Sequence, residues 1–304
     1  MISRDDGAET RVKVVADPLF RALSMVLSGG AWYEVICASA FILALAGIRR
    51  VWGTERAETL VSVLVVGLFF GVSWEPEGTG LVWSYHGFRI YAFMGIPLAI
   101  LLSWAWWMIL CRLLSERMLR LIERGWGAGS RRLNSVAFFA SGLLAASVIE
   151  PLSVYLNWWE YLVIGDRAAL VFPLLGVRFN LTVIIGWGVL TVVNLTFSEL
   201  ARGLFASGIE GRLGLSRIQA LLLSSALLGL ISGWASWQLV ALFAASVENA
   251  APRLFLTRDH IYILEGLTGA QLATLLLLAS AILYYLWKKT RRRDEFVGSN
   301  GLGV

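Results

Sequence analysis

Long uncharged apolar runs alternate with short charged segments along most of the chain. Seven of the runs are long enough to cross a bilayer as helices, which takes about 17 to 25 residues each. The pattern therefore predicts an all-α fold, a polytopic membrane helical bundle with about seven transmembrane helices. The expected spans are 32–48, 58–74, 90–111, 133–150, 170–198, 218–247 and 264–287.

The two ends of the chain differ in pattern from the bundle at 32–287. Residues 1–31 hold an amphipathic stretch that starts at Asp17-Pro18, a favourable helix beginning, and that places its leucines on one face. We expect this helix to lie in the membrane interface. Residues 288–304 form a basic tail.

Composition and charge agree with a lipid environment. Apolar residues make up 58% of the 304 and charged residues only 15%, which is too little polar surface for a water-soluble globule of this size. The net charge is +5, but the basic residues gather in the tail and in the segments 49–57, 112–132 and 199–217, as cytoplasmic anchors do. We therefore expect no nucleic-acid partner. The same charges predict a cell-membrane protein with its N-terminus outside and its C-terminus in the cytoplasm.

Carboxylates recur at the outer ends of the predicted spans. Two Trp-rich stretches, 73–85 and 147–161, each begin with an apolar run that leads into a Glu-Pro pair, Glu75-Pro76 and Glu150-Pro151. Because proline disfavours helix at the residue before it, we expect each Glu on the last helical turn and an irregular segment from each proline onward. A Glu at the edge of the hydrocarbon layer costs a few kcal/mol unless it faces protein or water. The repeated placement indicates a functional site, although such acids can also mark a helix end that contacts water.

Aromatic side chains surround these two acids. They could form the ordinary aromatic belt at the interface, or they could line a site for a polyene or a carbocation, whose charge an aromatic face stabilises by up to about 2 kcal/mol. The candidate ligand-lining residues are Trp74, Trp83, Tyr85, Tyr155, Trp158 and Trp159. Secondary candidates on the same face are Glu160, His86, His260 and Glu248. The spacing of the two histidines fits no metal-binding motif, so we expect no metal.

Spans two to seven also suggest three hairpins in parallel repeat, each beginning with an apolar helix that ends in an acid. LLAASV at 143–148 is nearly repeated by LFAASV at 242–247. Pairs of small residues predict close helix contacts at Gly67/Gly71, Gly142/Ala146 and Gly229/Gly233. The alternative is that membrane helices share this composition without any repeat.

With these residues described, the chain resembles the membrane-embedded carotenoid biosynthesis proteins that include the bisanhydrobacterioruberin and gamma-carotenoid hydratases. The shared pattern is an acidic, Tyr/Trp-rich loop, a Gly-x-Pro helix start and a following Trp. It occurs at Glu75 to Tyr85, Gly95-Ile96-Pro97 and Trp104, and more loosely at Glu150-Pro151, Trp158-Trp159, Gly176-Val177, Asn180 and Gly186-Trp187. The resemblance implies addition of water to a terminal isoprenoid double bond, with no redox cofactor and a carotenoid-like substrate.

This chemistry agrees with the residues themselves. Hydration of a trisubstituted alkene needs an acid that protonates carbon, a group that stabilises the tertiary cation and a base for the attacking water. We expect Glu75 and Glu150 to be the acid and base, in an order that the sequence leaves open, within an aromatic site. Two other hypotheses remain: a proton- or cation-coupled transporter, and a structural membrane subunit. In each case we expect membrane lipid around the bundle.

Overall fold

The computed structural model describes residues 29–79, 83–126, 133–161, 169–172 and 177–250. Most of them are helical, and six helices are long and apolar enough to cross a membrane within this part of the chain. The protein is therefore an integral membrane protein with an all-α bundle. The helices are α2 (Gly30–Arg50), α3 (Glu55–Gly78), α4 (Leu98–Trp126), α5 (Leu133–Tyr155), α6 (Leu181–Leu200), the π-helical turn η1 (Ala201–Phe205), α7 (Ala206–Leu213) and α8 (Arg217–Ala250).

Two of the expected spans begin later than predicted. The segment before α4 forms a hairpin of β2 (Tyr91–Phe93) and β3 (Ile96–Pro97), and the segment before α6 forms a hairpin of β5 (Ala169–Phe172) and β6 (Val177–Asn180). Strands this short show no clear alternation of apolar and polar residues. The sequence pattern therefore includes each hairpin in the predicted span that follows it. The expected span 264–287, the N-terminal interfacial helix and the basic tail lie outside the described residues.

The expectation that each proline starts an irregular segment is wrong, although Glu75 does lie on the last turn of α3. Pro76 lies inside α3 and Pro151 lies inside α5. A proline costs a helix one backbone hydrogen bond, and near the C-terminal end that loss is limited to the last turns. In α3 the end is closed by Thr79, whose backbone N–H and hydroxyl donate to the carbonyl oxygen of Glu75 at 3.0 and 2.8 Å.

A short antiparallel ribbon joins the two Trp-rich segments. Strand β1 (Trp83–Tyr85) pairs with β4 (Trp159–Tyr161), with Trp83 opposite Tyr161, Ser84 opposite Glu160 and Tyr85 opposite Trp159. Side chains alternate between the two faces of a strand, so the aromatic residues share one face and the polar pair takes the other. The ribbon brings residues that are 74 to 78 positions apart into register.

Close helix contacts at small residues are confirmed. A Cβ atom at Gly67 would lie 2.6 Å from the carbonyl oxygen of Trp104, so α3 and α4 touch through their backbones there. Gly229 and Gly233 of α8 approach the backbone of α3 in the same way, with a Cβ at Gly233 lying 2.5 Å from the carbonyl oxygen of Phe70. These contacts hold α8 against the middle of α3.

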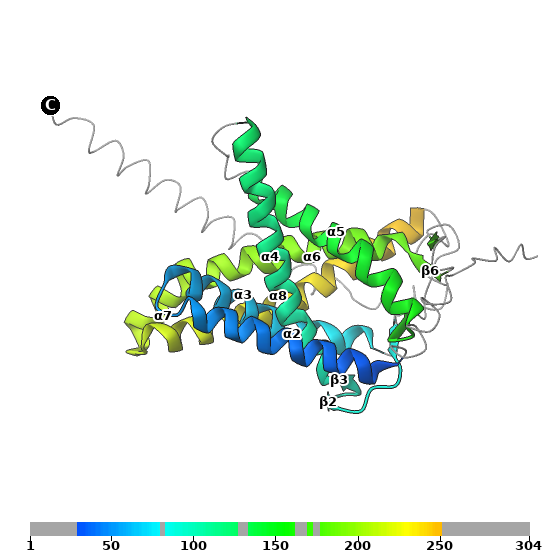
Figure 1. Cartoon of the computed structure of the whole chain (residues 1–304), viewed down its shortest axis with the longest axis horizontal. Coiled ribbons are helices and arrows are strands. Elements are labelled where there is room, and N and C mark those ends of the chain that lie inside the picture. Colours follow the sequence, from blue (N-terminus) through cyan, green and yellow to red (C-terminus); the bar gives the residue numbers. More distant parts are fainter. Residues whose placement is uncertain (1–28, 80–82, 127–132, 162–168, 173–176, 251–304) are drawn as a thin grey trace, which may run out of the picture.

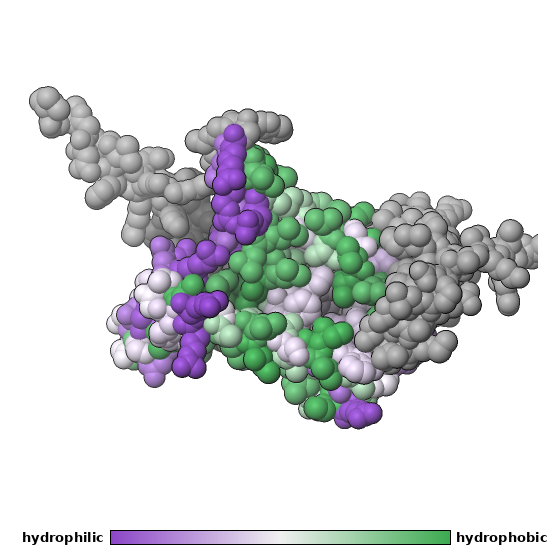
Figure 2. All heavy atoms as spheres, viewed as in Figure 1, coloured by the Kyte–Doolittle hydropathy of each residue, from purple (hydrophilic) through white to green (hydrophobic). Residues whose placement is uncertain are grey.

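Charged residues gather at one end of the bundle, here called the arginine-rich end and defined by residues 49–56, 112–124 and 199–217. In Figure 1, α7 lies at this end and β6 lies at the other. Figure 2 shows hydrophilic side chains over α7 and over the far part of α4, with a hydrophobic band across the middle of the molecule. Ion pairs such as Arg202–Glu55 at 2.8 Å and Arg217–Glu58 at 3.0 Å join the helices there.

Candidate functional site

Glu75 is buried near the end of α3 and accepts three hydrogen bonds from neutral donors. The indole N–H of Trp83 and the hydroxyl of Tyr85 donate to its Oε2 at 3.0 and 2.5 Å. The indole N–H of Trp104, in the first turns of α4, donates to its Oε1 at 2.6 Å. Only 3% of Glu75 is exposed, so these three side chains replace water around the carboxylate.

Glu150 has the same surroundings on α5. Trp159 Nε1 and Tyr161 Oη donate to its Oε2, at 3.3 and 2.5 Å, and Trp187 Nε1 of α6 donates to its Oε1. Its exposed fraction is 1%. Each carboxylate thus binds a Trp and a Tyr from its ribbon strand and a second Trp from the following helix.

The two carboxylate sites belong to equivalent halves of the bundle. In each half an apolar helix carries the Glu, a Trp-x-Tyr strand follows, then a short hairpin, and then a helix that supplies the second Trp. Gly67 precedes Glu75 by the same eight positions as Gly142 precedes Glu150. A Cβ at Gly142 would lie 2.7 Å from the carbonyl oxygen of Trp187, which matches the contact of Gly67 with Trp104. The first two expected hairpins therefore share one architecture, and the return helix of the third lies outside the described residues.

The two sites are joined into one. The rings of Trp104 and Trp187 stack with centroids 4.6 Å apart and planes 20° from parallel. Each indole therefore donates to its own carboxylate and packs on the other indole. Together with the β1–β4 ribbon, this stacked pair places Glu75 and Glu150 around a single aromatic centre.

The donors offset part of the cost of burying negative charge at this centre. An indole N–H can only donate, and each carboxylate receives two of them in addition to a phenol. Burial, and then the charge of Glu75, raise the pKa of Tyr85 well above its usual value of 10.0. Burial and the charge of Glu150 raise the pKa of Tyr161 in the same direction. Both tyrosines therefore remain protonated donors at neutral pH.

The other predicted lining residues form an aromatic layer around this centre. Trp74 stacks on Trp83 with centroids 6.3 Å apart, and Trp237 of α8 packs edge-on against both. On the Glu150 side, Trp158 packs against Tyr33 of α2 at 4.7 Å. Tyr155, the last residue of α5, is partly buried against the core.

The secondary candidates separate from the carboxylate centre. Glu160 and Ser84 face the opposite side of the ribbon, where Ser84 Oγ donates to Glu160 Oε1 at 3.0 Å and His86 Nε2 lies 3.2 Å from the same oxygen. The side chain of Glu248 and all of His260 lie outside the described part of the structure. The described residues contain no group of three or more His, Cys, Asp or Glu that could hold a metal ion.

Sequence reasoning did not assign three of the carboxylate ligands: Trp104, Tyr161 and Trp187. The repeated Trp-x-Tyr strand could have identified Tyr161, since its counterpart Tyr85 was assigned. Trp104 and Trp187 lie in the resemblance pattern, but their distance along the chain from the acids, 29 and 37 positions, gave no indication of direct contact.

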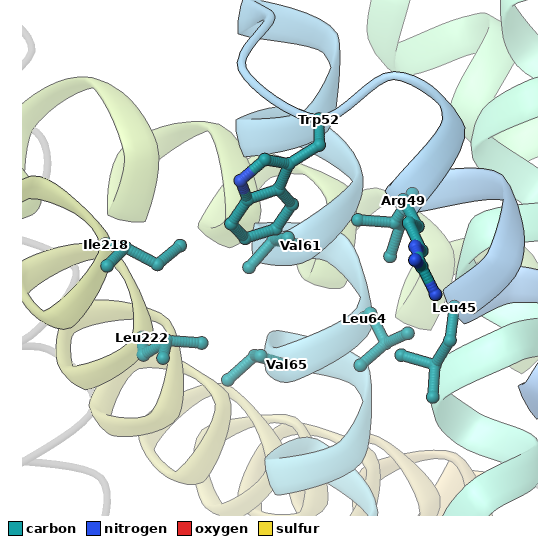
Figure 3. Close-up of a pocket in the computed structure, with 9 residues that line it drawn as sticks. Leu45, Arg49, Trp52, Val61, Leu64, Val65, Ile218 and Leu222 are labelled. Carbon is teal, nitrogen blue, oxygen red and sulfur yellow. The ribbon is translucent and has the colours of Figure 1, made fainter.

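A groove of about 380 Å³ lies away from this centre, between α2, α3 and α8 near the arginine-rich end. Figure 3 shows its apolar walls, with Ile218, Leu222 and Val65 on one side and Leu64 and Leu45 on the other. Arg49 and Trp52 are its polar and aromatic borders. The groove contains neither of the buried carboxylates.

Comparison with known protein families, curated proteins and solved structures gave no match.

Proposed function

We propose that the protein is a membrane enzyme of carotenoid or isoprenoid biosynthesis that adds water across a terminal carbon–carbon double bond. The observation that carries this proposal is the pair of buried carboxylates, Glu75 and Glu150, around the stacked indoles of Trp104 and Trp187. The resemblance to the carotenoid hydratases supports the same reaction.

In the proposed reaction one glutamic acid donates its proton to the terminal alkene, and the π electrons form the new C–H bond. The adjacent tertiary carbon becomes a cation, which the indole faces and the second carboxylate stabilise. Water then forms a C–O bond to that carbon and gives one proton to the second carboxylate. The net change is the addition of one water molecule, with no oxidation or reduction, and proton exchange with solvent restores the two carboxyl groups.

The aromatic donors give each Glu a means of changing protonation state. The tyrosine hydroxyl can donate to a carboxylate and can also accept from a carboxylic acid, whereas an indole N–H cannot accept. Tyr85 and Tyr161, at 2.5 Å from their carboxylates, are therefore the ligands that can reverse their hydrogen bonds during proton transfer. We assign them as positioning residues.

A second candidate is a proton- or cation-coupled transporter. It is favoured by the burial of two acids in a membrane bundle whose described hydrogen-bond donors to them are all neutral. In both cases we propose a cell-membrane location with the carboxylate centre towards the outside and the arginine-rich end in the cytoplasm.

Expression in a lycopene-producing host tests the proposal. Mass analysis of the extracted pigments should show species heavier than the parent pigment by one water, and Glu150→Gln should abolish them while Glu160→Gln should retain them. Unchanged pigments, together with a proton-coupled flux in vesicles that Glu150→Gln removes, would favour the transporter.

A further inference from the structure

A line of side chains follows the contact between α4 and α6 from the aromatic centre towards the arginine-rich end. Trp107 packs against Trp187 with centroids 5.6 Å apart, and one turn further on Thr191 lies beside the Cys111 thiol. The line ends where Arg112 Nη1 donates to Glu199 Oε1 at 2.7 Å. This α4–α6 seam comprises Trp104, Trp107, Cys111 and Arg112 of α4 and Trp187, Thr191 and Glu199 of α6, together with Asn194, which lies one turn beyond Thr191 on α6.

Three buried polar atoms along the seam have no nitrogen or oxygen hydrogen-bond partner among the described residues: Trp107 Nε1, Thr191 Oγ1 and Asn194 Oδ1. Thr191 and Asn194 are 0% and 1% exposed. The thiol beside Thr191 is a weak hydrogen-bond partner. Buried polar groups are nearly always paired, and internal water is the usual partner when protein atoms do not supply one.

The neighbouring helix α5 packs directly against this part of the seam at a glycine. A Cβ at Gly142 of α5 would lie 2.3 Å from Thr191 Oγ1, so any side chain there would cover the hydroxyl. At the far end of the seam, Glu199 is 39% exposed and reaches solvent at the arginine-rich end. On the other side of the carboxylates, the ribbon residues Tyr85 and Tyr161 already use their hydroxyls on Glu75 and Glu150.

We propose that the α4–α6 seam binds internal water and supplies water and protons to Glu75 and Glu150 from the arginine-rich end. This inference rests on the proposed function, since a hydratase consumes one water per turnover at a centre that is closed to bulk solvent. Thr191 and Asn194 act as positioning residues for that water. Arg112 and Glu199 form the mouth of the seam.

The two native cysteines provide a matched test. Cys111 lies in the seam, whereas Cys37 lies between α2 and α4 beside Tyr33 and Trp106, and both are fully buried. A thiol reacts with Ag⁺ as its thiolate, which forms where water can accept the proton. In lipid nanodiscs, Cys111 in the Cys37→Ser variant should bind Ag⁺ about tenfold or more faster than Cys37 in the Cys111→Ser variant, as measured by intact mass.

Substitutions in the seam make the test specific. Thr191→Val, which replaces the hydroxyl by a methyl group of similar size, and Asn194→Leu should each slow the reaction of Cys111 and leave that of Cys37 unchanged. Thr191→Ser retains the hydroxyl and should retain the fast reaction. Equal rates of reaction with Ag⁺ for the two cysteines would overturn the inference. A rate at Cys111 that Thr191→Val leaves unchanged would also overturn it.

Hydration activity measured on the same samples separates this inference from the proposed function. If Cys111 reacts as expected but no polyene is hydrated, the seam stands and the hydratase proposal fails. If hydration proceeds at full rate while Cys111 is inert to Ag⁺, the seam is not the water route and the carboxylate assignment is unaffected.

Discussion

The glutamine substitution of Glu75 tests whether the aromatic donors bind a carboxylate. In the structure Oε2 accepts from Trp83 and Tyr85, and Oε1 accepts from Trp104. Glutamine has one acceptor oxygen, so if that oxygen takes the place of Oε2, its NH₂ group points at the indole N–H of Trp104. Two donors then face each other in a buried position, and the unpaired indole should cost about 1–3 kcal/mol of folding free energy.

A double-mutant cycle with Trp104→Phe isolates this effect. Phenylalanine removes the indole N–H, so it should relieve the conflict in the Glu75→Gln background although it is destabilising in the wild type. We expect an interaction energy of about 1–3 kcal/mol between the two substitutions, measured by unfolding in mixed detergent micelles. The equivalent cycle with Glu150→Gln and Trp187→Phe should give the same sign. Additivity to within about 0.5 kcal/mol in both cycles would refute the hydrogen-bond assignment.

Three further predictions concern the bundle. Gly67→Leu and Gly142→Leu should each destabilise the protein by about 1–3 kcal/mol, because the new Cβ would meet a backbone carbonyl, whereas Gly47→Leu, with nothing within 4 Å, should be near neutral in the same thermal unfolding assay. Burial raises the pKa of Tyr85 and Tyr161 in the folded protein. Their contribution to the free energy of unfolding is therefore present below the unfolded pKa of about 10 and is lost as the pH rises through the folded pKa. A free energy of unfolding that stays constant across that pH range would contradict the burial. Cysteine at Glu160 should react with an impermeant thiol reagent added outside cells and cysteine at Gly211 should not, and the reverse labelling would invert the proposed topology.

The apolar runs were sufficient to predict the bundle because a membrane helix needs little more than about 20 apolar residues. They misplaced the starts of α4 and α6 because β2, β3 and β5 contain no charged residue and adjoin the apolar helices that follow. The Glu-Pro pairs correctly marked buried acids, but a local rule about proline could not show that α3 and α5 continue past it.

The carboxylate centre was only half predictable for a related reason. Glu75, Trp83 and Tyr85 are close in sequence, so their association could be inferred from one segment. The stacked pair of Trp104 and Trp187 depends on how two separate hairpins pack, and the pairing of Ser84 with Glu160 depends on a ribbon between distant strands. Such contacts arise from tertiary structure and leave no periodic signal in the sequence.

We propose that water adds to an isoprenoid double bond between Glu75 and Glu150. The most direct measurement is ¹⁸O incorporation: purified protein in lipid is given an acyclic polyene in H₂¹⁸O under ordinary oxygen, and the product is analysed by mass spectrometry. We predict one ¹⁸O atom in a new tertiary hydroxyl, formed at a rate that falls about two orders of magnitude or more in Glu75→Gln and Glu150→Gln but far less in Glu160→Gln. A product without ¹⁸O, or full activity in both Gln variants, would contradict the account.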